Sequence, residues 1–175
     1  MLQLIPATAY DRALLFNINQ KYLYEMTAFY DDPMDDMGNL HYGHFDEYFT
    51  DPERTALLIY ADGRLAGFAM LCPYSYFNET TDQSLAPDQS LAPDQSLAPD
   101  HVMAEFTIFP HFRRKGLATE AARRILAAYP GRWEIKYNEK NAPARALWNS
   151  IAGPYRPDVY RLNDEETVLV FSTEA

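Results

Sequence analysis

Hydrophobic and polar positions alternate with two different periods along this chain, and each period predicts a type of element. Near the N-terminus, Leu2, Leu4 and Ile5 indicate a short strand that Pro6 closes. Apolar residues then recur at helical spacing, which predicts an amphipathic helix that begins after Thr8 and runs to about Ala28. Its apolar positions are Leu14, Leu15, Ile18, Tyr22 and Met26.

The remaining pattern predicts a chain in which strands and helices are interspersed. Two apolar runs, Thr55–Tyr60 and Arg64–Leu71, flank the turn signal Ala61-Asp62-Gly63 and predict an antiparallel hairpin. Further strands are expected at Val102–Phe109, Trp133–Tyr137, Val159–Leu162 and Thr167–Phe171, and further helices at His44–Phe49, Gly116–Tyr129 and from Asn141 to about Ile151. This order predicts one mixed α/β domain over residues 1–175.

A short repeat interrupts this pattern. The hexapeptide Asp-Gln-Ser-Leu-Ala-Pro begins at Asp82, Asp88 and Asp94. Three copies are too few to build a β-helix, so we expect a low-complexity insertion at about residues 78–100 that joins two strands. The alternative is a specific binding element.

Composition and charge narrow the class of protein. The 175 residues fit one domain, and 47% hydrophobic residues are enough for a full core. The net charge of −10 argues against broad nucleic-acid binding. No membrane span and no secretory signal are apparent, and the single cysteine, Cys72, allows no internal disulfide. A cytoplasmic protein is the expectation.

Several catalytic signatures are missing from the sequence. The seven glycines form neither a dinucleotide-binding fingerprint nor a phosphate-binding loop of the G-x-x-x-x-G-K type, and no serine lies in G-x-S-x-G. Cys72 lies in an apolar run and is expected to be packed. His41 and His44 have no clear third partner, so no metal site is predicted.

The segment from Arg113 to Ala118 carries the most informative chemistry. It leaves a predicted strand and enters a predicted helix, whose first N–H groups have no intrahelical acceptors and form a positive end. Three cationic side chains precede Gly116, which lets a ligand approach the backbone. These features indicate a pyrophosphate site; the alternative is a basic helix start with a glycine kept for packing.

Two motifs in this order resemble those of the GNAT superfamily of N-acetyltransferases. Arg113-x-x-Gly116-x-Ala118 is similar to its acetyl-CoA motif, and Asn141-x-x-Ala144-x-x-Leu147-Trp148 is similar to its later helix motif. The predicted element order agrees as well, and two further segments resemble a bacterial subgroup of predicted acetyltransferases. The resemblance implies the GNAT acyl-CoA N-acyltransferase fold, a mixed sheet with flanking helices.

The resemblance also implies where the acyl donor, acetyl-CoA, would bind. The pantetheine arm would lie along the backbone of Ile108 and Phe109, between the strand of Glu105 and the strand Trp133–Tyr137. Asn141 would contact the pantetheine or cap the last helix, and Arg145 would approach the adenosine phosphates. The residues expected to wrap the pyrophosphate are Arg113, Arg114, Lys115, Gly116, Leu117 and Ala118.

The implied reaction is direct attack of an amine on the acetyl thioester. Glu105 is the candidate base, because a carboxylate is costly in an apolar strand unless it has a partner or lines a cavity. Pairing with a neighbouring strand explains it equally well. In the family, a tyrosine on the last helix commonly protonates the leaving thiolate, and this sequence has Trp148 at that position. Tyr155 is the candidate for the general acid instead.

An acidic stretch suggests the acceptor. The resemblance places one wall of the acceptor site in the segment that begins at Asp31, which favours a cationic primary amine of a small molecule or peptide over a merely solvated loop. The candidate contacts are Tyr30, Asp31, Asp32, Asp35 and Asp36. Neither nucleic acid nor a membrane is expected as a partner. A homodimer is compatible with the sequence. The alternative function is a non-catalytic acyl-CoA sensor.

Overall fold

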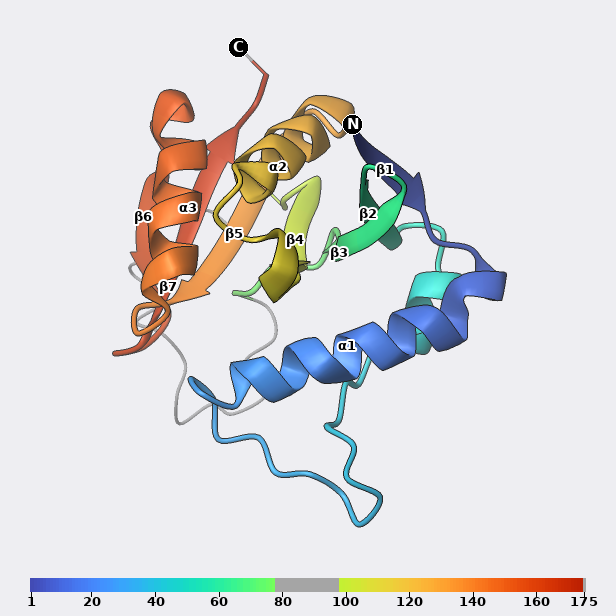
Figure 1. The fold of residues 1–175 in the computed structure, drawn as a ribbon. Helices are drawn as coiled ribbons and strands as arrows, with labels where there is room; N and C mark the ends of the chain where they lie inside the picture. Colours follow the sequence, from blue (N-terminus) through green and yellow to red (C-terminus); the bar gives the residue numbers. More distant parts are fainter. Residues whose placement is uncertain (78–97, 175) are drawn as a thin grey trace.

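A computed structural model describes residues 1–77 and 98–174. Seven strands and three helices longer than one turn make up this part of the chain (Figure 1). In chain order they are β1 (Leu2–Pro6), α1 (Arg12–Met26), β2 (Thr55–Ala61), β3 (Arg64–Cys72), β4 (His101–Ile108), α2 (Leu117–Ala128), β5 (Arg132–Asn138), α3 (Ala142–Ala152), β6 (Asp158–Arg161) and β7 (Glu166–Ser172).

The strands form one mixed sheet in the order β1-β2-β3-β4-β5-β7-β6. All neighbouring pairs are antiparallel except β4 and β5, which run parallel. A parallel pair needs a crossover connection, and α2 supplies it here. The mixed α/β fold expected from the hydrophobic pattern is therefore confirmed.

The predicted elements agree with the structure to within a few residues. The first helical segment begins after Thr8 as expected, as a 3₁₀ turn at Ala9–Asp11 that continues into α1, and the backbone N–H and the hydroxyl of Thr8 both donate to the Asp11 carboxylate, at 2.9 and 2.8 Å. The helix expected at His44–Phe49 is a 3₁₀ turn at Asp46–Phe49. Most of the insertion predicted at about residues 78–100, including nearly all of the repeat, lies outside the described residues.

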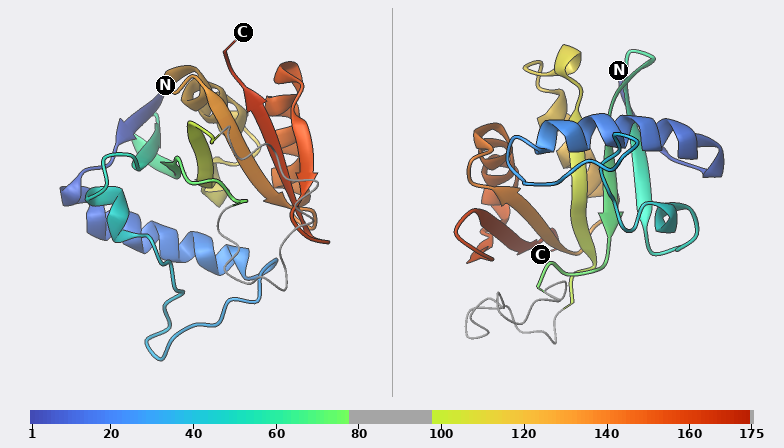
Figure 2. Two further views of the ribbon diagram at one scale, coloured as in Figure 1. Left: turned by 180° about the vertical axis from the view of Figure 1, so that it is seen from behind. Right: turned by 90° about the horizontal axis from the view of Figure 1, so that it is seen from below.

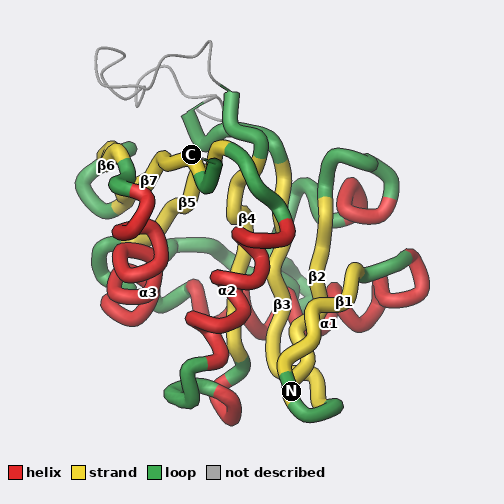
Figure 3. The backbone as a smooth tube through the Cα atoms, turned by 90° about the horizontal axis from the view of Figure 1, so that it is seen from above, coloured by secondary structure: helices red, strands yellow, loops and turns green. Residues whose placement is uncertain are grey.

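The helices cover both faces of the sheet. α1 crosses one face, where Leu15 and Ile18 pack with Phe68 and Met70 of β3. α2 and α3 lie on the opposite face, where Ile125 and Ile151 join a cluster with residues of β4, β5 and β7. The view from below shows α1 in front of the strands, and the view from above shows α2 and α3 in front (Figures 2 and 3). The sheet is thus the middle of three layers.

Within this part of the chain, no helix is both long enough and apolar enough to span a bilayer. Cys72 is 6% exposed, as its apolar surroundings in the sequence predict.

Candidate acyl-transfer site

The parallel strands β4 and β5 separate partway along their length. They pair only through His101–Trp133, Val102–Glu134 and Met103–Ile135, although β4 continues to Ile108 and β5 to Asn138. Backbone N–H and C=O groups inside a sheet need partners, and beyond this point neither strand supplies them to the other. The divergence therefore leaves two strand edges available to an extended ligand.

Two local features bend β4 away from β5. The pairing of β3 with β4 passes from Leu71–Met103 to Met70–Glu105, so that Ala104 is an extra residue on β4. Such a bulge bends its strand and increases its twist. Further along, a Cβ atom at Gly67 of β3 would lie only 2.1 Å from the Thr107 carbonyl oxygen, so only glycine allows the close approach seen here. Both features hold β4 against β3.

Glu105 lies just beyond the divergence and faces α1. Its cross-strand neighbour is Met70, which packs in the cluster under α1. Burial, and then the charge of Glu105 and a hydrogen bond to it, raise the pKa of Tyr22 on α1. Burial followed by the Glu105 charge likewise raises the pKa of Tyr42. These phenols stay protonated at neutral pH, and the Tyr22 hydroxyl donates to the Glu105 carboxylate.

A second polar group occupies the β5 side of the divergence. Lys136, the first β5 residue beyond the last pair, places its Nζ 2.9 Å from Oε1 of Glu166 on β7. The Tyr30 hydroxyl donates to the same oxygen at 3.2 Å. Burial, and then the Glu166 charge, raise the pKa of Tyr30. Tyr30, a predicted acceptor contact, is therefore held beside this ion pair at the divergence.

The loop before α2 is built as an open helix N-terminus. Gly116 is the N-cap with φ +78°, no side chain caps the helix, and Arg114 is also left-handed at φ +61°. A Cβ at Gly116 would meet no heavy atom within 4 Å, so the space beside it is open. The first N–H groups of α2 have no intrahelical acceptor, and with Lys115 beside them they suit an anion.

Arg113 has a structural role in this loop. Its Nε donates to the Ile108 carbonyl oxygen at 2.6 Å, and its guanidinium pairs with Glu25 of α1 at 2.5 Å. The side chain thus ties the end of β4 to α1. The neighbouring cations Arg114 and Lys115 are exposed.

The residues predicted near the start of the last helix lie at the diverging end of β5. Asn141 accepts a hydrogen bond from the Ala144 N–H at 3.2 Å, so it caps α3 as expected. Arg145 is exposed and lies 3.4 Å from the carboxylate of Glu139. Both residues follow the β5 edge that β4 leaves unpaired.

The structure does not bring Tyr155 to Glu105. Tyr155 stacks on Phe171, with ring centroids 5.3 Å apart. Phe171 lies opposite Trp133, which is opposite His101, and Glu105 is a further four residues along β4, about 13 Å. The two residues also face opposite sides of the sheet. Trp148 is 5% exposed and packs edge-on against Phe106 of β4, at 5.1 Å.

The acidic residues predicted to contact the acceptor differ in what they bind. Asp31, Asp32 and Asp36 are exposed in the loop after α1. Asp35 is also exposed, but its carboxylate accepts from the Met37 and Asn39 N–H groups, both at 2.8 Å. Hydrogen bonds from the Asn39 backbone lower the pKa of Asp35. Asp35 therefore organises the loop.

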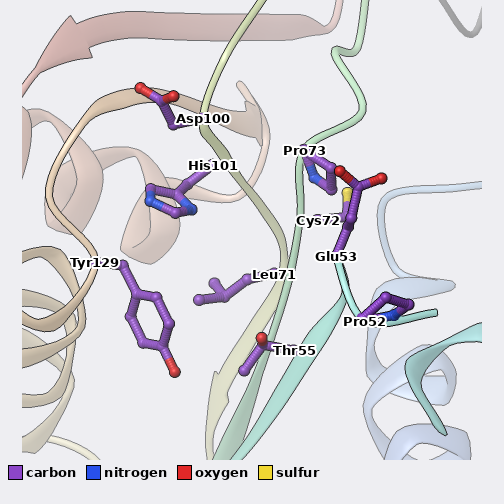
Figure 4. Close-up of a pocket in the computed structure, with 9 residues that line it drawn as sticks. All are labelled: Pro52, Glu53, Thr55, Leu71, Cys72, Pro73, Asp100, His101 and Tyr129. Atoms are coloured by element: carbon purple, nitrogen blue, oxygen red, sulfur yellow. The ribbon is translucent and has the colours of Figure 1, made fainter. Parts of the chain in front are cut away.

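A cavity of about 300 Å³ lies near the start of β4, away from the α2 N-terminus (Figure 4). Asp100 and His101 line it together with Tyr129 at the end of α2, and Leu71 and Cys72 contribute from β3. Elsewhere in residues 1–77 and 98–174, as here, no three His, Cys, Asp or Glu side chains gather as a metal site would require.

Four residues at or beside the divergence are not among the residues predicted for the site, and they are Tyr22, Tyr76, Lys136 and Glu166. Tyr22 fits the core face of a helix and Glu166 fits a terminal turn, so the local pattern explains each of them without a site. Lys136 does give a usable signal, since a cation in the middle of a buried strand needs a partner. Tyr76, which follows β3 and whose hydroxyl donates to the Met103 carbonyl oxygen, gives none.

Comparison with known proteins identifies the family of this chain. The sequence model of the acetyltransferase (GNAT) family matches residues 15–153. No curated protein sequence matches the chain.

Solved structures share the fold along nearly the whole chain. An acetyltransferase from Thermus thermophilus is 16% identical with a TM-score of 0.64, over 98% of this chain and 97% of that one. The aminoglycoside acetyltransferase AAC(6')-Ib, in complex with coenzyme A and kanamycin, is 11% identical with a TM-score of 0.63, over 99% and 96%. NAA60 of Arabidopsis thaliana, in complex with acetyl-CoA, is 12% identical with a TM-score of 0.59, over 100% of both chains.

At these identities the solved structures establish the fold, and the family match covers well over half of the sequence. The chain belongs to the GNAT family of acetyltransferases.

Proposed function

We propose that this protein is an acetyl-CoA-dependent N-acetyltransferase whose acceptor is a cationic primary amine. The observation that carries the proposal is the divergence of β4 and β5, with Glu105 two residues beyond the last pair and the open N-terminus of α2 following β4. An extended acyl donor needs both a strand edge and an anion site, and these two features supply them.

Similar structures support the assignment of the donor. NAA60 was solved with acetyl-CoA, and AAC(6')-Ib with coenzyme A and kanamycin, an aminoglycoside. In this chain the pyrophosphate would meet the N–H groups from Gly116 to Ala118, with Arg114 and Lys115 as exposed cations beside them. The pantetheine would follow the β4 edge toward Glu105, past Phe109 and Ile108.

Glu105 is the proposed base. The carboxylate, directly or through water, takes a proton from the ammonium group, and the neutral amine nitrogen then forms a bond to the thioester carbonyl carbon. The carbon–sulfur bond breaks to release the CoA thiolate, and the second amine proton passes to the thiolate or to water. Backbone N–H groups on the unpaired β4 edge would stabilise the oxyanion. No acid is assigned to the leaving thiolate, because the indole of Trp148 is not a useful acid and a thiolate leaves without much assistance.

The acceptor proposal rests on charge. Asp31, Asp32 and Asp36 are exposed on the loop after α1, and Tyr30 connects this loop to Glu166 at the divergence. A cation approaching Glu105 from this side would meet negative potential and aromatic faces. A polyamine, an aminoglycoside or a lysine side chain has the required chemistry.

The second candidate is an acyl-CoA sensor that binds the donor without turnover, and it is favoured by Trp148, which is buried where the family commonly carries a tyrosine. An assay of CoA thiol release from acetyl-CoA, with a panel of cationic, neutral and acidic amines, separates the two. The proposal predicts release that depends on a cationic amine. Tight binding of acetyl-CoA without release for any amine would establish the sensor instead.

A further inference from the structure

A buried carboxylate on β5 holds the segment that follows β3. Glu134 is 1% exposed and lies between Val102 and Val170 in the sheet. Its two oxygens accept from the Ser75 hydroxyl at 2.8 and 3.0 Å, and one of them also accepts from the Tyr76 N–H at 3.0 Å. These bonds fix the backbone at Ser75 and Tyr76 against β5.

This arrangement has an energetic cost, which argues that it serves a purpose. Burial raises the pKa of Glu134, and the bonds from Ser75 and Tyr76 lower it only partly. A valine or leucine at this position would fill the same layer of the core without a charge to bury. What the carboxylate adds is a fixed position for the chain at Tyr76.

Tyr76 contacts both strands at the point where they separate. Its hydroxyl donates to the carbonyl oxygen of Met103 at 2.7 Å, and Met103 is the last β4 residue paired with β5. Its ring lies 4.9 Å from Nζ of Lys136, the first β5 residue beyond that pair. The phenol thus contacts the last β4 residue of the ladder and the side chain of the first β5 residue beyond it.

We propose that Tyr76 is a positioning residue that ends the β4–β5 ladder by engaging the Met103 carbonyl, and that Glu134 anchors it there. The bulge at Ala104 turns β4 aside, and the ladder does not extend past Met103–Ile135 because the Met103 carbonyl is already engaged and the ring holds Lys136 aside. The consequence for acyl-donor binding rests on the proposed function. The effect on strand pairing does not, since it is a property of the free protein.

The test compares Tyr76→Phe with Tyr74→Phe. Both changes remove one hydroxyl from the same segment, but the Tyr74 hydroxyl contacts Asp51 at 3.0 Å, on the β2 side, and not the divergence. Amide hydrogen exchange is measured in the free proteins for those amides of Lys136, Tyr137 and Asn138 that face β4 rather than β7, relative to Trp133–Ile135, which pair with both strands. Acetyl-CoA affinity is measured by calorimetry on the same samples.

In Tyr76→Phe the ladder should extend, so exchange at residues 136–138 should slow by about threefold or more, and acetyl-CoA should bind about threefold or more weakly. Tyr74→Phe should change neither quantity. Glu134→Leu should shift both in the same direction as Tyr76→Phe, because a leucine side chain cannot accept from the Ser75 hydroxyl or the Tyr76 N–H.

Unchanged or faster exchange at residues 136–138 in Tyr76→Phe would overturn the proposal, since a merely stabilising tyrosine would loosen this region when lost. Slower exchange with unchanged donor affinity would uphold the role in pairing and contradict its link to the donor. Failure of the proposed function would appear separately, as absence of acetyl-CoA binding to the wild-type protein.

Discussion

Met103 on β4 and Ile135 on β5 form the last pair between the two parallel strands, and the geometry of the candidate site follows from that limit. Beyond it, a bulge at Ala104 turns β4 toward β3 and brings Glu105 onto the face that α1 covers. The same strand continues to the loop that opens α2. One irregularity in the sheet thus connects the proposed base with the proposed anion site.

The role of Glu105 can be tested by Glu105→Gln. We expect kcat with the best amine to fall by about a hundredfold or more, because a positioned base commonly contributes that much. Acetyl-CoA affinity should stay within about threefold of wild type, since the carboxylate is not proposed to hold the donor. The measurement is steady-state thiol release over a range of pH, with calorimetry for the donor.

Glu120→Gln, on the exposed first turn of α2, is the matched control and should keep wild-type kcat. A Glu105→Gln protein with wild-type turnover across the pH range would remove Glu105 from the mechanism.

The acidic loop is tested by Asp31→Asn combined with Asp32→Asn. These carboxylates are exposed, and screening by salt should weaken kcat/KM for a cationic amine more in wild type than in the variant. Asp35 is left intact because its hydrogen bonds to Met37 and Asn39 shape the loop. Equal salt dependence in the two proteins, or a preference for an acidic or neutral amine, would contradict the acceptor proposal.

The Lys136–Glu166 pair predicts a specific pH dependence of stability. Burial alone would raise the pKa of Glu166, but the charge of Lys136 and hydrogen bonds bring it below its usual value. A lowered pKa in the folded state stabilises the protein above the unfolded pKa of about 4.5, and this contribution disappears as pH falls through the folded value.

Lys136→Met removes the partner and leaves a half-buried carboxylate. We expect the free energy of unfolding at pH 7 to fall by about 1 kcal/mol, with the deficit shrinking as pH falls below about 4.5 and Glu166 becomes protonated. Urea unfolding at pH 7 and at acidic pH measures this, with Lys21→Met on the exposed face of α1 as control. A deficit that stays constant with pH would mean that the charge pair is not its cause.

The repeat insertion is expected to be dispensable for folding. β3 and β4 pair directly from Cys72–Val102 to Gly67–Ile108, so the sheet does not depend on the length of the connection. Replacing residues 82–97 with a few Gly and Ser should change the free energy of unfolding by about 1 kcal/mol or less. Loss of the cooperative unfolding transition would show instead that the repeat packs against the core.

The sequence pattern is sufficient to predict the helices and strands. It is not sufficient to predict where β4 and β5 separate. Periodicity locates α2 and the β2–β3 hairpin, because local spacing and turn residues determine them. The β4–β5 ladder ends at a bulge at Ala104 and beside a hydrogen bond from Tyr76 to Met103, and no local pattern marks either feature.

The polar groups at the divergence come from distant parts of the chain. Tyr30, Lys136 and Glu166 lie on three separate segments, and only the sheet order brings them together. Tyr155 is a natural candidate by sequence proximity to α3, yet α3 runs away from the divergence and leaves it stacked on Phe171. Proximity in sequence does not predict a site residue there, because the direction of the helix determines which end of the sheet a residue reaches.

The central claim, that the N-terminus of α2 holds the pyrophosphate of an acyl donor, is tested most directly by the affinity of acetyl-CoA for two variants. Gly116→Asn and Gly116→Asp have nearly the same shape, both residue types tolerate the φ of +78°, and the space beside Gly116 is open. Asp should also favour the helix itself, because a negative charge suits its N-terminus. A difference in binding between the two therefore reports on charge at the donor site.

Calorimetric titration with acetyl-CoA should show Gly116→Asp binding about tenfold or more weakly than Gly116→Asn, with the gap narrowing as salt rises. Equal affinity of the two folded variants for acetyl-CoA would contradict the account, because a phosphate group at this helix end could not be indifferent to a carboxylate beside it.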